Sequence, residues 1–323
     1  MHLIGSGNVG FLDSFDGGVL RGWVGSRNNE AFAYRFDVVV DGRPMGEYVS
    51  HYYRDDVVQH IGRDGIYGFA IVLDEVRPGA MANICVDNDT IPVVCGGAGD
   101  TRPRLEHPYA YMHIQKTAGT TLRDAILKLH GPDRSLLVYG DSPGVPFDVV
   151  QQMSARQLAQ FDIFIGHYYY GFLPDPDDRL RYVTVLRDAR ARLISNVYHH
   201  NRTRPAAGGS IEEIIARDRI VEYDNYMVRS LGAVDFSAAA FGEIGPEHLA
   251  QAKHVIERRF EFVGRIENID AMIQAYKGIL FDGEKLPRSN QNTSTWRADS
   301  EGDLSRYYRY DDMLYEYVLR RFG

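Results

Sequence analysis

The chain of 323 residues has little cysteine and no long apolar segment. Cys85 and Cys95 are its only cysteines, which excludes a disulfide-rich fold. They fall in neighbouring predicted strands and could face each other, but two buried, reduced thiols are expected. No apolar run approaches the roughly 18–20 residues that span a bilayer. The first ten residues lack a basic region and a long apolar core, so no signal peptide is predicted. These absences indicate a cytoplasmic protein.

Basic residues are scarce in the first hundred positions, which hold seven Arg, no Lys and fourteen Asp or Glu, a net charge of −7. The whole chain carries −8, which leaves −1 for the remainder. An acidic chain argues against non-specific nucleic-acid binding. An anionic ligand must therefore be held by local basic groups in the second part of the chain.

Residues 1–98 have the pattern of an all-β domain. Short runs rich in Val, Ile, Tyr and Phe alternate with turn signals, and Asp41-Gly42 predicts a hairpin turn. The predicted strands are 19–24, 33–40, 45–50, 68–73, 82–86 and 91–94. Even spacing without a helical period favours a small β-sandwich. Trp23 could stack on a sugar, but core packing is expected. Residues 99–108, rich in Gly and Pro, are predicted to be a linker.

From residue 109 to residue 323 the pattern changes to alternating strands and helices. Strands are predicted at 109–114, 136–139, 162–166, 180–186 and 260–263, and helices at 154–160, 189–201, 246–258, 269–280 and 311–321, with a further helix opened by a capping box at 210–213. This order predicts an α/β fold with a P-loop-type, mostly parallel sheet and helices on both faces. Ligands of such sheets bind beyond the carboxyl ends of the strands, where Lys116, His167 and Arg187 fall.

A turn of small residues with one lysine joins the strand at 109–114 to a helix. It consists of Gln115, Lys116, Thr117, Ala118, Gly119, Thr120 and Thr121. First-turn amides have no intrahelical partner and carry the positive end of the helix dipole. Lys116 adds a full charge, the threonines add hydroxyl donors, and Gly119 permits close approach. The turn predicts a phosphate- or sulfate-binding loop. An ordinary strand-to-helix turn capped by threonine is the alternative.

Three further residues are candidates for the same site. His167 follows a strand directly, and its near-neutral pKa suits a general base, although a lone histidine can be structural. The Arg187 guanidinium can make a bidentate contact with a phosphate. Ser195, two turns into the next helix, can add a hydroxyl donor to the same ligand. The alternative is a surface Arg-Asp pair with an incidental serine. No His or Cys cluster has metal-ligand spacing, so no metal is predicted.

Taken together, these motifs resemble sulfotransferases that use 3′-phosphoadenosine-5′-phosphosulfate (PAPS). Residues 113–121 resemble their 5′-phosphosulfate loop, and residues 185–195 their 3′-phosphate element. Residues 166–171 resemble the catalytic-histidine segment of the carbohydrate branch that includes heparan-sulfate 2-O-sulfotransferase. Segments 224–229, 262–270 and 312–317 follow in the family's order. The first part, through 22–23, 38–42, 53–57 and 65–69, resembles an accessory β-sandwich found beside bacterial glycan- and envelope-modifying enzymes.

The resemblance implies transfer of a sulfuryl group from PAPS to a hydroxyl of a glycan or glycolipid, without a metal. The product would be 3′-phosphoadenosine-5′-phosphate (PAP). Residues 115–121 would hold the 5′-phosphosulfate, and Lys116 would neutralise charge on the bridging oxygen. Arg187 and Ser195 would hold the 3′-phosphate, and His167 would act as base. Residues 290–296 would close over the cofactor. A glycolipid acceptor would bring peripheral membrane association, and no nucleic-acid partner is expected.

The chain departs from the family pattern at three positions. The family usually has Pro where Gln115 stands, Gly where Ala118 stands and Pro where Ala189 stands. An alanine at 118 fits if its φ is negative. Two other functions stay open. A P-loop kinase or NTPase needs Gly-x-x-x-x-Gly-Lys-Ser/Thr, whereas here Lys116 precedes Gly119. A glycan-binding protein with an inactive transferase fold is the second.

Overall fold

The computed structural model describes residues 2–3, 7–16, 18–28, 31–73, 76–77, 79–86, 89–94, 104–139, 144–175, 177–202, 209–284 and 298–322. The chain divides into two compact units, 1–106 with 131–164 and 107–130 with 165–323. Half of the predicted linker, residues 99–103, falls outside the described residues, so the boundaries at 98 and 109 stay a prediction. The structure adds that residues 131–164 pack with the N-terminal part of the chain.

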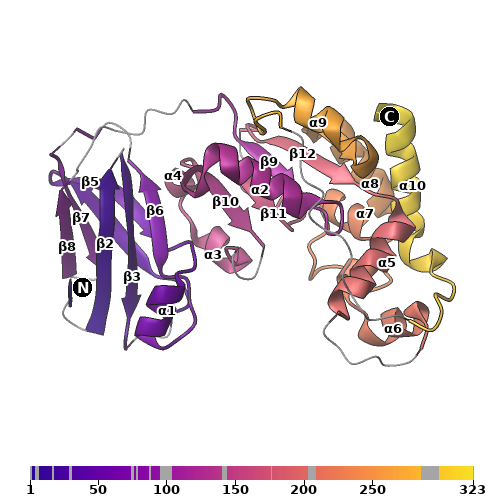
Figure 1. Ribbon diagram of the computed structural model, residues 1–323, viewed down its shortest axis with the longest axis horizontal. Coiled ribbons are helices and arrows are strands. Elements are labelled where there is room, and N and C mark those ends of the chain that lie inside the picture. Colours follow the sequence, from indigo (N-terminus) through magenta and orange to yellow (C-terminus); the bar gives the residue numbers. More distant parts are fainter. Residues whose placement is uncertain are drawn as a thin grey trace. The chain divides into compact units, whose positions relative to one another are not determined.

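The N-terminal part of the first unit consists of two four-stranded antiparallel sheets (Figure 1). In spatial order, one sheet contains β1 (His2–Leu3), β2 (Asn8–Asp16), β3 (Val19–Ser26) and β6 (Gly68–Val72), and the other β5 (Arg43–Val49), β4 (Arg35–Val40), β7 (Met81–Val86) and β8 (Asp89–Val94). The predicted strands are present. The turn between β4 and β5 has positive φ at Asp41 (47°) and Gly42 (79°), as a tight hairpin requires.

Three elements of this part escaped the sequence pattern, the strands β1 and β2 and the helix α1 (Asp55–Ile61). The helix fully buries only Val57, and Val58 and Ile61 pack partly buried against the core, so its apolar residues span too few turns to reveal a helical period. Its ends add further stabilisation. Asp55 and Asp56 lie at the positive end of the helix dipole, and Gly62 ends the helix in the left-handed conformation, with φ 79°.

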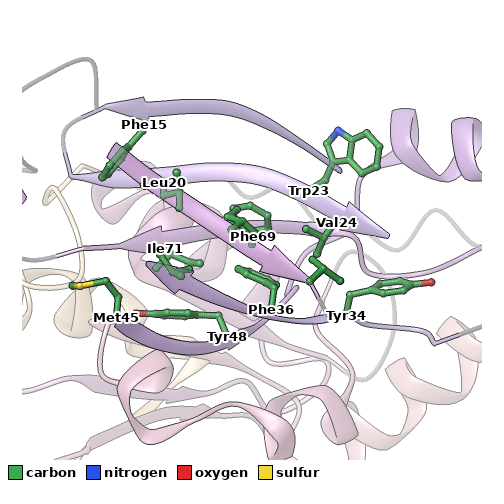
Figure 2. Packing of buried hydrophobic residues seen from close by; sticks show 14 of the residues in the cluster. Phe15, Leu20, Trp23, Val24, Tyr34, Phe36, Met45, Tyr48, Phe69 and Ile71 are labelled. Carbon is green, nitrogen blue, oxygen red and sulfur yellow. The ribbon is translucent and has the colours of Figure 1, made fainter. Parts of the chain in front are cut away.

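The two sheets share one core, which Figure 2 shows at close range. Phe36 of β4 and Phe69 of β6 come from different sheets, and their ring centroids lie 4.6 Å apart. Trp23 belongs to the same cluster and is buried, which confirms its packing role. Cys85 was expected to be buried, and that was wrong. Its neighbours on β7 at alternate positions face the core, so its own side chain points the other way and is partly exposed. Cys95 lies outside the described residues.

The segment 131–164 covers the edges of both sheets with amide side chains. It contains η2 (Pro132–Arg134), β10 (Ser135–Val138), α3 (Phe147–Gln152) and α4 (Ala155–Leu158). Gln157 donates to the Val49 carbonyl (2.7 Å) and accepts from the Val49 amide (2.9 Å) on β5. Gln160 donates to the Ala70 carbonyl (3.1 Å) and accepts from the Val72 amide (3.3 Å) on β6. Each amide thus pairs an edge strand as a neighbouring strand would.

Replacing Gln157 with leucine should lower the free energy of unfolding by about 2–4 kcal/mol. Gln157 is 0% exposed, and the variant would leave the buried amide and carbonyl of Val49 without these partners, at about 1–3 kcal/mol each. Urea denaturation measures the loss. Gln152→Leu, at the exposed end of α3, is the control. Equal stability of the two variants would contradict the pairing.

The second unit is built on strands that lie in the order β11-β9-β12-β13. Its strands are β9 (Tyr109–Met112), β11 (Ile163–Gly166), β12 (Arg181–Leu186) and β13 (Phe260–Arg265), and β12 pairs in parallel with both β9 and β13. Its helices are α2 (Gly119–His130), α5 (Ala189–His200), α6 (Ile211–Asp218), η3 (Val221–Tyr223), α7 (Tyr226–Leu231), α8 (Pro246–Arg259), η4 (Ile266–Asn268), α9 (Ile269–Ala275) and α10 (Ser305–Phe322). The predicted α/β fold, with a parallel sheet flanked by helices, is confirmed (Figure 1).

The predicted starts of α6 and α8 agree with the structure. Ser210 and Glu213 form the capping box of α6, and Pro246 opens α8. The C-terminal helix is longer than predicted, because α10 already begins at Ser305, and α9 ends earlier, at Ala275. Within the part of the chain that the structure describes, no helix is both long enough and apolar enough to cross a bilayer.

A buried polar cluster fixes α5 against α7 and α10. Asp311 of α10 accepts from the amides of Met227 (3.1 Å) and Val228 (2.8 Å), at the start of α7. Arg192 of α5 is fully buried, lies 3.7 Å from the Asp311 carboxylate and donates to the Glu222 carbonyl (3.1 Å). The helix that follows β12 is therefore held in place by charged groups as well as by its apolar face.

Candidate active site

The turn after β9 has an unusual backbone. The His113 amide donates to the Gly166 carbonyl (2.9 Å), which continues the pairing with β11 past the end of β9. Lys116 and Ala118 then adopt left-handed conformations, with φ of 68° and 66°. The helix α2 begins at Gly119, and the Ala118 carbonyl accepts from the amide of Thr121 (3.1 Å).

This backbone suits an anion. Left-handed residues among residues of negative φ turn successive amides toward a common side and make an anion-binding concavity. The first-turn amides of Gly119 and Thr120 add the positive end of the helix dipole. The Thr117 hydroxyl takes a different part from the predicted one, because it is buried and donates to the Ile114 carbonyl (2.7 Å). Thr117 therefore braces the turn and can offer a ligand only its amide.

Ala118 does not meet the condition under which an alanine would fit without strain. That condition was a negative φ, and its φ is +66°. A residue with a Cβ in this region has a cost of about 1–2 kcal/mol, which glycine avoids. The turn therefore keeps its left-handed conformation although residue 118 is not glycine.

Replacing Ala118 with glycine should raise the free energy of unfolding by about 0.5–1 kcal/mol. The left-handed strain disappears, and part of the gain is offset by the greater freedom of glycine in the unfolded chain. Thermal unfolding measures the change. Ala125→Gly in the middle of α2 is the control, and it should destabilise by about 1 kcal/mol. A loss of stability in Ala118→Gly would show that the left-handed conformation is not maintained.

Cations gather around this turn. The Arg187 guanidinium, directly after β12, donates to the Lys116 carbonyl (3.1 Å) and so joins two strand ends. Burial lowers the pKa of Lys116, and the positive charges of Arg187 and Arg202 lower it further. Each charged group named here is positive, so the position favours a bound anion that would offset their repulsion.

His167 lies next to this charge, directly after β11. Burial lowers its pKa to about 3, and Arg123, His199 and Lys116 contribute in the same direction. The imidazole is therefore neutral near pH 7. A neutral imidazole can accept a proton, and a neighbouring anion would raise its pKa and make it a stronger base.

Sequence reasoning missed three members of this cluster, Arg123 of α2, His199 of α5 and Arg202 just beyond α5. The pKa of His199 is lowered to about 4, mainly by burial and further by the positive charges of Lys116 and Arg202. Arg123 has a signal that could have been used, since it stands in the first turns of the helix that opens the loop. The signal was weak for His199, which seemed only one of two adjacent histidines, and Arg202 has none.

The structure gathers most of the predicted site residues at one edge of the sheet. Seven of them belong to the loop after β9 and the start of α2: Gln115, Lys116, Thr117, Ala118, Gly119, Thr120 and Thr121. Thr117 and Gly119 are buried, and the other five are partly exposed. Ser195 lies in the middle of α5 and is partly exposed, and its proposed contact with a 3′-phosphate stays a prediction. Residues 290–296 lie outside the described residues. Among the described residues, no group of three or more His, Cys, Asp or Glu side chains could hold a metal ion.

Comparison with known proteins gives a likeness at the level of structure. No model of a known protein family matches the chain, and no curated protein matches it. Among solved structures, the chain is similar to the crystal structure of the mouse sulfotransferase SULT7A1 complexed with PAP, at 12% identity and a TM-score of 0.31. The likeness covers 55% of this chain and 58% of that chain. At this level it carries no argument about function.

The site therefore has to be interpreted from its own residues. A left-handed turn, a helix start, a lysine and an arginine converge where parallel strands end, beside a neutral imidazole. This arrangement can bind a polyanion through the turn and accept a proton beside it.

Proposed function

We propose that the protein is a sulfotransferase that uses PAPS and acts on a hydroxyl of a glycan or glycolipid. The observation that supports this most is the contact of Arg187 with the Lys116 carbonyl, which brings two cations from different strand ends to one anion-binding turn. PAPS is a polyanion with a phosphosulfate and a 3′-phosphate, so a site with two cations suits it. The choice of acceptor, a cytoplasmic location and peripheral membrane association rest on the family resemblance alone.

The fit of the residues to PAPS follows from their chemistry. PAPS supplies the sulfuryl group: the acceptor oxygen bonds to its sulfur as the bond from sulfur to the 5′-phosphate oxygen breaks, and PAP leaves. The amides from Thr117 to Thr120 bind the 5′ end, and Lys116 stabilises charge on the departing oxygen. Arg187 binds the 3′-phosphate. His167 takes the proton of the acceptor hydroxyl.

The first test is calorimetric titration with PAP, 5′-AMP and ATP in the absence of magnesium. PAP differs from 5′-AMP by the 3′-phosphate, so the ratio of the two affinities isolates that group. We expect micromolar PAP binding, at least tenfold weaker 5′-AMP binding, and loss of this ratio in Arg187→Ala. Arg190→Ala is the matched control, because Arg190 is exposed in the first turn of α5 and pairs with Glu301.

Three outcomes would change the proposal. Absence of PAP binding in the wild-type protein would refute it. Tight ATP binding in place of PAP binding, with nucleotide turnover once magnesium is added, would favour a P-loop kinase or NTPase. Retained PAP binding without turnover on any acceptor would instead favour the glycan-binding protein with an inactive transferase fold.

A further inference from the structure

We propose that His113 is a positioning residue that sets the separation between the anion-binding turn and His167. The inference rests on the proposed function, because it assigns His113 a part in the same site. His113 follows β9 and precedes the turn, and its ring is buried. Its ring is in fact placed between the two groups on which the chemistry depends.

On one side the His113 ring faces the base. Its centroid lies 4.4 Å from that of His167, with an interplanar angle of 62°. Tyr111 stacks near the same ring at 6.1 Å and 5°, and His113 is only 6% exposed. The backbone contributes as well, since the His113 amide donates to the carbonyl of Gly166, the residue before His167. A ring held in this way limits where the His167 imidazole can lie.

On the other side the His113 ring lies against the start of α2. A Cβ on Gly119 would stand 2.5 Å from the Cγ atom of His113 and would overlap its Cδ2 and Nε2 atoms. Real Cβ atoms do not approach other atoms this closely, so either the ring or the helix start would have to move. The glycine is therefore required by the protein's own histidine. This differs from the initial expectation, in which Gly119 allowed a ligand to approach.

These contacts connect the anion-binding turn to the His167 imidazole through the His113 ring. A shift of the first turn of α2 would press on His113, and His113 would press on His167. The other charged or titratable groups that face His167 are Arg123 from α2, Lys116 from the turn and His199 from α5. Those groups act on His167 through charge, whereas His113 also acts on it by ring contact.

The test is a double-mutant cycle of Gly119 and His113, in which the affinity for PAP is measured for each variant. Gly119→Ala should weaken PAP binding at least tenfold, because the added methyl displaces the ring or the helix start. The double variant Gly119→Ala/His113→Ala should recover to within about threefold of His113→Ala alone, because the smaller side chain leaves room for the methyl. Gly119→Ala/His113→Phe is the matched control. Its ring fills the same space, so it should stay as weak as Gly119→Ala.

A second measurement observes the base directly. NMR of the His167 imidazole should show a changed resonance and a changed pKa in His113→Ala, and a smaller change in His113→Phe, which keeps a ring in place. A side chain with a purely structural part elsewhere would leave the His167 signal unmoved. If Gly119→Ala fails to fold, recovery of a folded, PAP-binding protein in the double variant supports the contact.

The outcomes separate this inference from the proposed function. If the wild-type protein binds PAP but the double variant binds as weakly as Gly119→Ala, the ligand requires the glycine and the inference is wrong. An unchanged His167 signal in His113→Ala would also refute it. If the wild-type protein does not bind PAP, the proposed function fails, and the NMR comparison still decides whether His113 positions His167.

Discussion

Replacing Lys116 with methionine should weaken PAP binding by about 10- to 100-fold and reduce turnover by a further 100-fold or more. A charge-assisted hydrogen bond contributes about 1.5–3 kcal/mol to binding, and loss of a donor to a developing anion has a larger effect on rate. Methionine keeps the aliphatic stem. Like lysine, methionine has an unbranched side chain, so the strain of the left-handed backbone at φ 68° is unchanged. The variant therefore measures the effect of removing the ammonium group.

The same variant has a spectroscopic consequence. Because the Lys116 charge lowers the pKa of His113, His167 and His199, its removal should raise all three, which histidine NMR titration can follow. Lys128→Met on α2 is the control, since Lys128 is exposed and pairs with Asp282 and Glu284. Unchanged PAP affinity in Lys116→Met would remove Lys116 from the site.

Acidification from pH 6.5 to 4 should cost the protein about 3 kcal/mol of stability through His51 alone. Burial lowers the pKa of His51 from 6.5 to about 4. The unfolded chain therefore binds a proton in this window that the folded chain does not, so stability is present above pH 6.5 and falls with pH until about pH 4. The Ala70 amide donates to Nε2 (3.4 Å), which suits a neutral ring, whereas the Val49 carbonyl, 3.1 Å from Nδ1, raises the pKa and offsets part of the effect of burial.

The measurement is the urea midpoint of wild type and His51→Asn at several pH values. A comparison of the two is needed because other groups contribute slopes of both signs. Burial raises the pKa of Asp311 to about 6, so its protonation stabilises the folded protein as pH falls below that value. The difference between His51→Asn and wild type should grow in favour of the variant on acidification, and His60→Gln at an exposed position is the control. A difference that does not change with pH would contradict the prediction.

The sequence predicted the elements whose signals are local. The apolar strand before the loop, the capping box at Ser210 and the hairpin at Asp41 each depend on residues that are close in the chain, and each is present. The placement of Lys116, His167 and Arg187 at one edge of the sheet followed from the parallel topology. These residues come together because parallel strands end at the same edge.

What the sequence could not predict depends on how the backbone bends and on where side chains then point. The left-handed φ of Ala118 contradicts its intrinsic preference and is imposed by the surrounding turn. The inward bond of the Thr117 hydroxyl depends on where the Ile114 carbonyl points. The reason for Gly119 lies in a ring six positions earlier. The helix α1 was missed because its apolar residues span too few turns, so no apolar period appeared.

The glutamine pairs on the edge strands have a consequence for how this chain can be rearranged. Gln157 and Gln160 cover β5 and β6, and both come from a segment that lies beyond β9 and α2 in the sequence. A protein cut after residue 106 would expose two strand edges, and open edges invite aggregation. Recombination that transfers residues 1–106 alone to another protein would therefore leave these strand edges open. Residues 1–106 and 131–164 have to be transferred together.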